Sequence, residues 1–301
     1  MGEYQHYRFD EFRPGVVAGV ALPGGAGLSN TGIVRLEPGS VLFDTTLSPA
    51  AFREVLGESR ERTGGTPTAV ANSHWHLDHI LGNQEVAHLS IYATERTVEI
   101  VTERRESLQN ELRPATLERD IRELEAQRDR ESSPAARAHY DLVLAMHRAL
   151  LRQAAEMRVT PPNQPFRDRL RLPGAAGAEL VTFGGGHTES DAVLFLPQPR
   201  VLFAGDLVVV GTHPNVTSGD PEQWLRILER IRQLGVEKIV PGHGPVAGPE
   251  ALDSVAEYLE TLLHLGEEDR PPELPERYRS WTSPEQFQEN WKYLRQRGSS
   301  A

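Results

Sequence analysis

The chain has 301 residues with 43 acidic and 32 basic side chains, a formal net charge of −11, and the 38% hydrophobic and 25% charged content typical of a globular protein. Cysteine is absent, which excludes disulfides, thiolate ligands, iron–sulfur clusters and cysteine nucleophiles. An acidic chain without a basic tract also argues against nucleic acid or an anionic membrane as the partner, so we expect a small-molecule substrate.

Residues 1–93 show short β-rich runs divided by glycine and proline, followed by a helix and a further strand. The predicted strands are Gly15–Leu22, Gly32–Leu36, Val41–Asp44 and Thr68–Asn72, and the predicted helix runs from Ser48-Pro49 through Arg62. Val16–Leu22 is the only apolar stretch near the amino end, and acidic residues precede it where a signal peptide carries positive charge. No run approaches the length of a membrane helix, so we expect a cytoplasmic protein.

Residues 94–157 differ in kind, because they are rich in Glu and Arg, lack glycine and repeat apolar residues at helical intervals. The predicted apolar faces are Leu117, Ile121 and Leu124, and Leu142, Met146, Ala149 and Leu150. Ser133-Pro134 is a typical helix start. We expect two or three amphipathic helices inserted into a β-rich domain, where they form a lid beside the substrate pocket or the dimer surface of a homo-oligomer.

From about Pro165 onward, strands return and alternate with helices. The predicted strands are Leu180–Phe183, Ala192–Leu196, Val201–Ala204 and Val236–Val240, and the predicted helices run from Asp220-Pro221 to Gly235 and over Pro249–Leu265. A proline-rich segment leads to a final short helix near Pro284–Arg295. Strand followed by helix in both halves favours an α/β fold, an αββα sandwich over residues 1–267, with a C-terminal extension at 268–301.

The strongest functional signal is His74-Trp-His76-Leu-Asp78-His79, which directly follows a predicted strand. Imidazole and carboxylate are the ligands that Zn(II), Fe(II) and Mn(II) accept. The i,i+2 spacing lets the first two imidazoles reach one ion, and the Asp-His pair projects from the next turn toward a second ion. The motif therefore predicts a metal site.

Three further ligand-type residues each follow a predicted strand. His187 comes after Gly184-Gly-Gly186, Asp206 ends Phe203-Ala-Gly-Asp206, and His243 lies in Pro241-Gly-His-Gly-Pro245. Catalytic groups commonly lie on such strand-end loops, which a rigid scaffold positions.

These four motifs, in this order, resemble those of the metallo-β-lactamase-fold hydrolases. The resemblance spans about residues 15–265 apart from the insertion at 94–157, and it implies an αββα sandwich with metals at one edge between two sheets. It implies that His74, His76 and His187 hold one ion, that Asp78, His79 and His243 hold the other, and that Asp206 bridges them. The cofactors would be two divalent ions, Zn(II) first, with Mn(II) or Fe(II) as alternatives.

Two further residues are candidates for the surroundings of the metals. Asp44 ends an early strand and is either a carboxylate that orients a ligand imidazole or a turn residue. His213 follows Asp206 closely in Thr212-His213-Pro214-Asn215 and is a candidate for substrate contact.

The resemblance implies a hydrolase in which a metal-bridging hydroxide attacks an ester, thioester, lactone or related bond, with Asp78 and Asp206 as the catalytic carboxylates. His76 stands where the flavin-linked diiron oxygen reductases carry Glu, which argues against that branch. The bridging Asp206 is typical of thioesterases, lactonases and phosphodiesterases and less so of true β-lactamases. The alternatives are a mononuclear Fe(II) sulfur dioxygenase of the same fold and, less favoured, a β-lactamase or a phosphodiesterase or nuclease.

Overall fold

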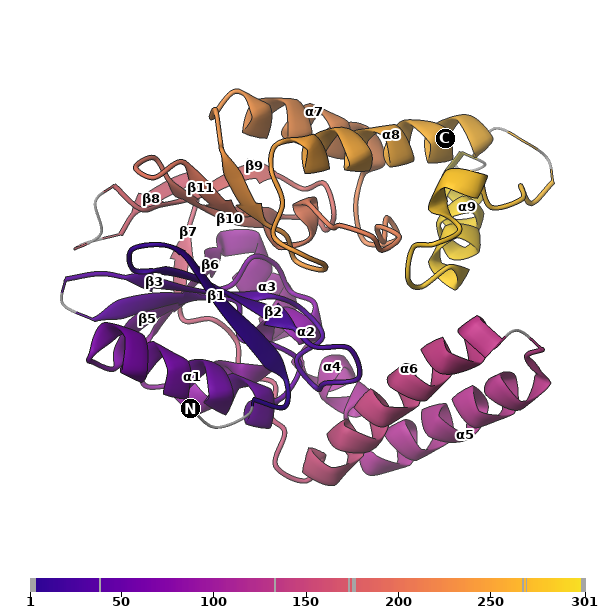
Figure 1. Cartoon of the computed structure of the whole chain (residues 1–301), viewed down its shortest axis with the longest axis horizontal. Coiled ribbons are helices and arrows are strands. Elements are labelled where there is room, and N and C mark those ends of the chain that lie inside the picture. Colours follow the sequence, from indigo (N-terminus) through magenta and orange to yellow (C-terminus); the bar gives the residue numbers. More distant parts are fainter. Residues whose placement is uncertain are drawn as a thin grey trace. The chain divides into compact units, whose positions relative to one another are not determined.

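The computed structural model describes residues 4–298 apart from Pro38, Ser133, Pro173, Ala175, Ala176, Glu267 and Asp269. The chain divides into two compact units, which Figure 1 draws in sequence colours: unit 1 is Met1–Phe166 with Pro173–Ala175, and unit 2 is Arg167–Leu172 with Ala176–Ala301. The expected helix cap Ser133 and the chain after residue 298 lie outside the described residues. The expectation of one domain over residues 1–267 stays a prediction.

Unit 1 contains a seven-stranded sheet in which the strands follow one another in chain order. Its strands are β1 (Tyr7–Arg13), β2 (Val16–Ala21), β3 (Thr31–Arg35), β4 (Ser40–Phe43), β5 (Pro67–Ala71), β6 (Ser90–Thr94) and β7 (Gln164–Phe166). The first four pair antiparallel, and the pairs from β4 to β7 are parallel. The carboxyl ends of β4 and β5 therefore meet at one edge, which is where the His-rich motif begins.

Helix α1 (Pro49–Thr63) confirms the predicted helix and its boundaries. The Ser48 side chain accepts a hydrogen bond from the Ala51 N–H, and proline occupies the first turn, where no N–H partner is needed. The helix ends at Gly64, whose φ of 71° favours glycine. Its apolar face packs on the sheet through Phe52 and Val55, both fully buried.

The insertion forms four helices among the described residues of unit 1 instead of the two or three expected. They are α3 (Glu95–Glu103), α4 (Arg105–Glu111), α5 (Pro114–Arg130) and α6 (Pro134–Gln153), and the short α2 (Leu77–Ile80) and the 3-10 turn η1 (Leu81–Val86) precede them. Leu117 and Leu150 are buried as expected. Leu142 was wrongly placed on a buried face, because it is 43% exposed and the buried stripe of α6 passes through Leu144 instead.

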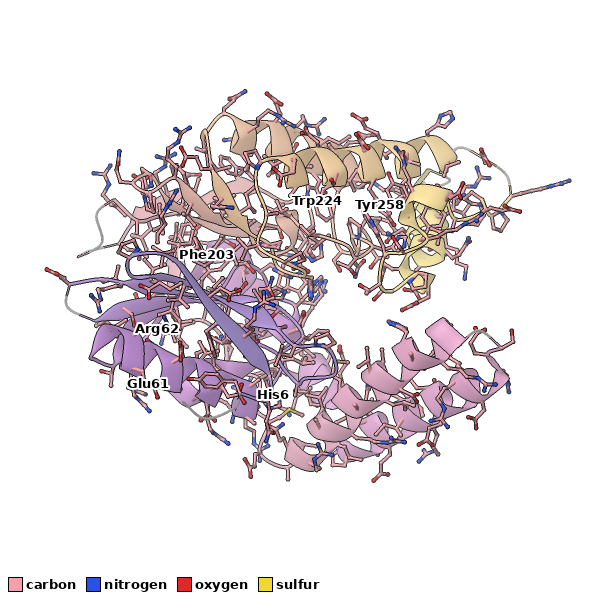
Figure 2. The ribbon with its side chains drawn as sticks, viewed as in Figure 1. His6, Glu61, Arg62, Phe203, Trp224 and Tyr258 are labelled. Carbon is pink, nitrogen blue, oxygen red and sulfur yellow. The ribbon has the colours of Figure 1, made fainter. Side chains whose placement is uncertain are left out.

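Unit 2 contains a five-stranded sheet in the order β12-β11-β10-β9-β8, and only the β11–β12 pair is parallel. Its elements are β8 (Arg169–Arg171), β9 (Glu179–Gly184), β10 (Asp191–Leu196), β11 (Val201–Phe203), η2 (Gly205–Leu207), α7 (Pro221–Arg232), β12 (Lys238–Val240), α8 (Glu250–Leu265), η3 (Glu276–Tyr278) and α9 (Glu285–Gly298). Phe203, Trp224 and Tyr258, labelled in Figure 2, are fully buried in its core.

No helix in the described part of either unit has the length and apolar character to cross a membrane.

Candidate metal centre

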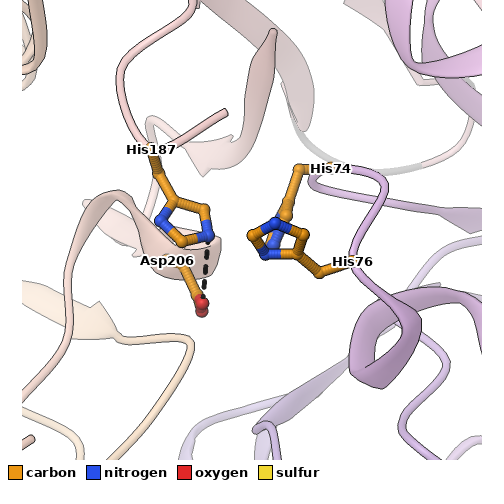
Figure 3. A group of neighbouring side chains, drawn as sticks. All are labelled: His74, His76, His187 and Asp206. Carbon is orange, nitrogen blue, oxygen red and sulfur yellow. Dashed lines mark ion pairs between the residues drawn. The ribbon is translucent and has the colours of Figure 1, made fainter. Parts of the chain in front are cut away.

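In unit 1 the residues after β5 gather three imidazoles and a carboxylate, the unit 1 cluster of His74, His76, Asp78 and His79. The ring centroid of His74 lies 4.7 Å from that of His76 and 4.2 Å from that of His79. His74 and His79 are buried at the end of the sheet. Figure 3 shows His74 and His76 projecting from this loop. The chain bends at residues 73–75, and the i,i+2 spacing places the rings of His74 and His76 beside one another. Their binding of one ion stays a prediction.

Asp44, at the end of β4, orients two of these rings. Its Oδ2 lies 2.7 Å from His79 Nδ1 and accepts a 2.8 Å hydrogen bond from the Ser73 hydroxyl, which itself lies 2.8 Å from His74 Nδ1. Burial raises the pKa of the Asp44 carboxyl, and the neighbouring His79 imidazole opposes that rise. Asp44 is fully buried with a φ of 61°, a backbone conformation that Asp tolerates better than most residues. It is therefore an orienting carboxylate as well as a turn residue.

In unit 2 a buried carboxylate shapes the loop that carries His187, between β9 and β10. Asp191 accepts hydrogen bonds from the backbone N–H groups of Gly186, His187 and Thr188 at 2.8, 2.9 and 3.1 Å, and from the Thr188 hydroxyl at 2.7 Å. Burial raises the pKa of the Asp191 carboxyl, and the His187 imidazole and these donors oppose the rise. Asp191 was not among the predicted residues, although an acidic residue at the start of an apolar strand is a signal visible in the sequence.

His187 and His243 converge on Asp206, and together they form the unit 2 cluster. His187 Nε2 lies 3.4 Å from Asp206 Oδ2, the contact drawn as a dashed line in Figure 3, and His243 Nε2 lies 3.3 Å from the same oxygen. The other ring nitrogen of His187, Nδ1, donates to the Asn215 carbonyl at 3.0 Å. A carbonyl only accepts, so this bond fixes the tautomer whose Nε2 carries the lone pair that a metal needs.

Glycine at 242 permits the close approach of the His243 loop to Asp206. A Cβ at this position would lie 1.9 Å from Asp206 Oδ1 and 2.8 Å from the Gly205 carbonyl carbon. The Gly242 N–H donates to the Gly205 carbonyl at 2.8 Å. No larger residue fits here without moving the carboxylate.

The spacing of the ligand-type atoms fits metal binding better than direct hydrogen bonding. Two ligands bonded at about 2.0–2.2 Å to a tetrahedral ion lie about 3.3–3.6 Å apart, whereas an N–H···O hydrogen bond spans about 2.7–3.2 Å. The His187 and His243 contacts to Asp206 fall in the first range, at 3.4 and 3.3 Å. In unit 1, His79 Nε2 lies 3.4 Å from Asp78 Oδ2. The donors in each cluster therefore suit a divalent ion in chemistry and spacing.

His213 lies away from solvent, at 4% exposure, in an aromatic cluster of unit 2. Its Nδ1 lies 3.1 Å from the Tyr258 hydroxyl, and its ring packs edge-on against Tyr258, Tyr278 and Trp281. Burial lowers the pKa of His213 to about 4. Its contact with substrate stays a prediction, and in this structure its partners are aromatic rings.

The insertion packs against the segment that follows the His-rich motif of unit 1. Leu108, Leu117 and Leu150 share one hydrophobic cluster with Ile80 and Leu81, which directly follow the His-rich motif, and Trp75 packs against that cluster. The Arg104 guanidinium lies 4.9 Å above the Trp75 ring. The expectation that the insertion acts as a lid or a dimer surface stays a prediction.

Comparison with known proteins gives a consistent family. A profile described as "Metallo-beta-lactamase superfamily" matches residues 24–243. The chain is 27% identical over 240 residues to the linear primary-alkylsulfatase of Pseudomonas sp. (strain ATCC 19151), which covers 74% of this chain and 43% of the relative. It is 34% identical over 80 residues to a hydroxyacylglutathione hydrolase of Synechococcus sp. (strain JA-3-3Ab), 22% of this chain and 32% of that protein. The chain thus spans less than half the length of these curated relatives.

Solved structures share the fold. The DIM-1 metallo-beta-lactamase matches 85% of this chain and 98% of its own, with a TM-score of 0.60 and 18% identity. This likeness and the family profile confirm the expected α/β metallo-β-lactamase fold.

Proposed function

The chain belongs to the metallo-beta-lactamase superfamily, and on that premise we propose that it is a dinuclear metal-dependent hydrolase acting on an ester-type bond of a small molecule. One observation carries the proposal: two imidazole Nε2 atoms from different strand-end loops approach one buried carboxylate oxygen of Asp206 at 3.3–3.4 Å. Because this carboxylate is approached from two loops, it could serve as a ligand to two ions at once.

The proposed ligands fall into two groups. By resemblance to the family, His74, His76 and His187, with Asp206, would hold one ion, and Asp78, His79 and His243, again with Asp206, would hold the other. Imidazole nitrogen and carboxylate oxygen are ligands that Zn(II) prefers, and cysteine, which softer sites use, is absent. Zn(II) is therefore the first cofactor to test, followed by Mn(II) and Fe(II).

When bound, two divalent cations supply Lewis acidity and lower the pKa of a shared water toward 7. The chain's own contribution is orientation and proton handling. Asp44 and the Asn215 carbonyl hold His79 and His187 through Nδ1, so that each ring presents Nε2. Asp206 is only 7% exposed, and its carboxylate can accept a proton from the attacking water and return it to the leaving group.

Two substrate classes have specific support. The bridging Asp206 favours thioesters, lactones and carboxyl esters. The thioester class is consistent with the match to a hydroxyacylglutathione hydrolase. The 240-residue match to an alkylsulfatase favours sulfate esters of primary alcohols. Both classes present a polarised centre bonded to an oxygen or sulfur leaving group.

The test is a metal count combined with a substrate screen. Purified chain is loaded with Zn(II), Mn(II) or Fe(II), metals per chain are measured by elemental mass spectrometry, and turnover is assayed on thioesters, lactones, aryl esters, alkyl sulfates, phosphodiesters and β-lactams. We expect two ions per chain and turnover of an ester-type substrate. One iron per chain with O₂ uptake would instead identify the sulfur dioxygenase alternative and overturn the proposal.

A further inference from the structure

We infer that Asn290, on the C-terminal helix α9, is a positioning residue that fixes the imidazole of His187 for metal binding. The inference rests on the proposed function in one respect, namely that His187 is a metal ligand. All the residues involved lie in unit 2.

The side-chain amide of Asn290 clamps the two peptide groups that flank Asn215. Its Nδ2 donates to the Pro214 carbonyl at 2.6 Å, and its Oδ1 accepts from the Val216 N–H at 3.1 Å. Asn290 is fully buried, so these bonds do not compete with water. The Asn290 amide therefore satisfies a backbone carbonyl before Asn215 and a backbone N–H after it. A neighbouring β-strand would hold the backbone of Asn215 in a similar way.

The backbone group held in this way is the one that orients His187. The Asn215 carbonyl accepts the 3.0 Å hydrogen bond from His187 Nδ1, and His187 Nε2 faces Asp206. A shift of Asn215 would rotate the ring or release its tautomer. Outer partners of metal-binding His residues commonly change metal affinity by about 10–100-fold when removed.

Two more side chains complete the clamp from helices α8 and α9. Tyr258 lies between Asn290 and His213: Asn290 Nδ2 donates to its hydroxyl at 3.2 Å, and that hydroxyl lies 3.1 Å from His213 Nδ1. Gln286 Nε2 donates to Asn290 Oδ1 at 2.9 Å and to Asn215 Oδ1 at 3.3 Å. The C-terminal extension thereby has a role that sequence alone did not assign, because it fixes residues 213–216 behind a metal ligand.

The decisive variant is Asn290→Ala, with Trp291→Phe as its matched control. Trp291 is also buried on α9, and the hydrogen bond of its side chain among the described residues runs from Nε1 to the Leu265 carbonyl and not to residues 213–216. Both variants loosen the docking of α9, but only the first removes the clamp. Zinc affinity is measured by chelator competition, and the His187 ring nitrogens are observed by long-range ¹H–¹⁵N NMR of ¹⁵N-labelled protein.

We expect Asn290→Ala to weaken zinc binding by about 10–100-fold and to change the Nδ1–H signal of His187. Its kcat should fall with little change in KM. Trp291→Phe should retain zinc affinity and the His187 signal even where its melting temperature drops equally. Unchanged zinc affinity in Asn290→Ala, or an equal loss in both variants, would overturn the inference.

Two provisions keep the test decisive. If Asn290→Ala fails to fold, Gln286→Ala can be used instead, because it removes one hydrogen-bond donor to Asn290. This variant should weaken zinc binding by a smaller factor. An unchanged zinc affinity in Gln286→Ala would then refute the inference. A wild-type chain that binds no zinc would refute the proposed function, whereas the His187 Nδ1–H signal in zinc-free Asn290→Ala would still decide whether Asn290 positions the ring.

Discussion

In the unit 1 cluster a buried carboxylate orients His79 and His74, whereas in the unit 2 cluster a neutral backbone carbonyl orients His187. Asp44 reaches His79 directly and His74 through Ser73. His187 donates instead to Asn215, whose flanking peptides depend on Asn290. A carboxylate stabilises a protonated ring nitrogen by charge, whereas a carbonyl orients a ring only when its own backbone is fixed. The same task is therefore done directly by a buried side chain in unit 1 and by a backbone group that a distant helix holds in unit 2.

The largest effect should come from Asp206, the carboxylate on which the unit 2 cluster converges. Asp206→Ala should lower kcat/KM by about 1,000-fold and reduce the metal content per chain, because it removes the proposed shared ligand. The matched control is Asp253→Ala, which removes an exposed carboxylate paired with Arg232 at 2.7 Å. Full activity in Asp206→Ala would contradict the dinuclear scheme.

The apolar support of the unit 1 cluster can be tested through the insertion. Leu150→Ala should cost about 2–4 kcal/mol in the free energy of unfolding, because a 4% exposed side chain leaves a cavity in the hydrophobic cluster that also contains Ile80 and Leu81. Leu142→Ala is the matched control: at 43% exposure it should change stability by less than about 0.5 kcal/mol. Urea unfolding measures both, and equal losses would contradict this packing.

The charge-based orientation in unit 1 predicts a substantial effect of Asp44→Asn. Zinc affinity should fall by about 10–100-fold, because the neutral amide no longer stabilises the His79 proton at Nδ1. Asp10→Asn, which neutralises an exposed carboxylate paired with Arg8 at 2.9 Å, is the control. If chelator competition shows a smaller loss for Asp44→Asn than for Asn290→Ala, the contrast drawn between the two clusters is wrong.

The smallest effect concerns pH and His213. Burial lowers the pKa of this ring to about 4, against about 6.5 in an unfolded chain. Between these values only the unfolded state binds the proton, so the free energy of unfolding falls as the pH drops from 6.5 to 4, by at most about 1.4 kcal/mol per pH unit. His213→Gln should make the loss of stability between pH 7 and pH 5 smaller than in the wild type. Equal losses in zinc-free protein would show that His213 does not titrate in this way.

Much of the fold follows from local patterns along the chain. Ser48 and Pro49 define the start of α1, and Asp220 with Pro221 defines that of α7, because caps and first-turn prolines act within a few residues. Strand β1 (Tyr7–Arg13) was missed, because its charged residues alternate on a partly exposed strand and resemble a loop in composition. The extra break between α3 and α4 was missed because Arg104 carries no helix-ending signal.

The candidate metal ligands were predicted from the sequence because each follows a strand and belongs to a short motif. The residues that orient them were less visible. Asp44 was suggested by its place at a strand end, but Asp191, Asn215 and Asn290 were not.

The sequence by itself determined the types of the candidate ligands, their order along the chain and the family to which the chain belongs, since these depend on residue identity and close spacing. Only the tertiary structure decided which groups hold the imidazoles in place. Asn290 and Val216 are 74 positions apart, and an asparagine on an amphipathic helix is indistinguishable in sequence from a solvated one. Their contact arises because α9 packs against α8 and residues 213–216, and packing across such distances is set by the whole fold and not by any local pattern.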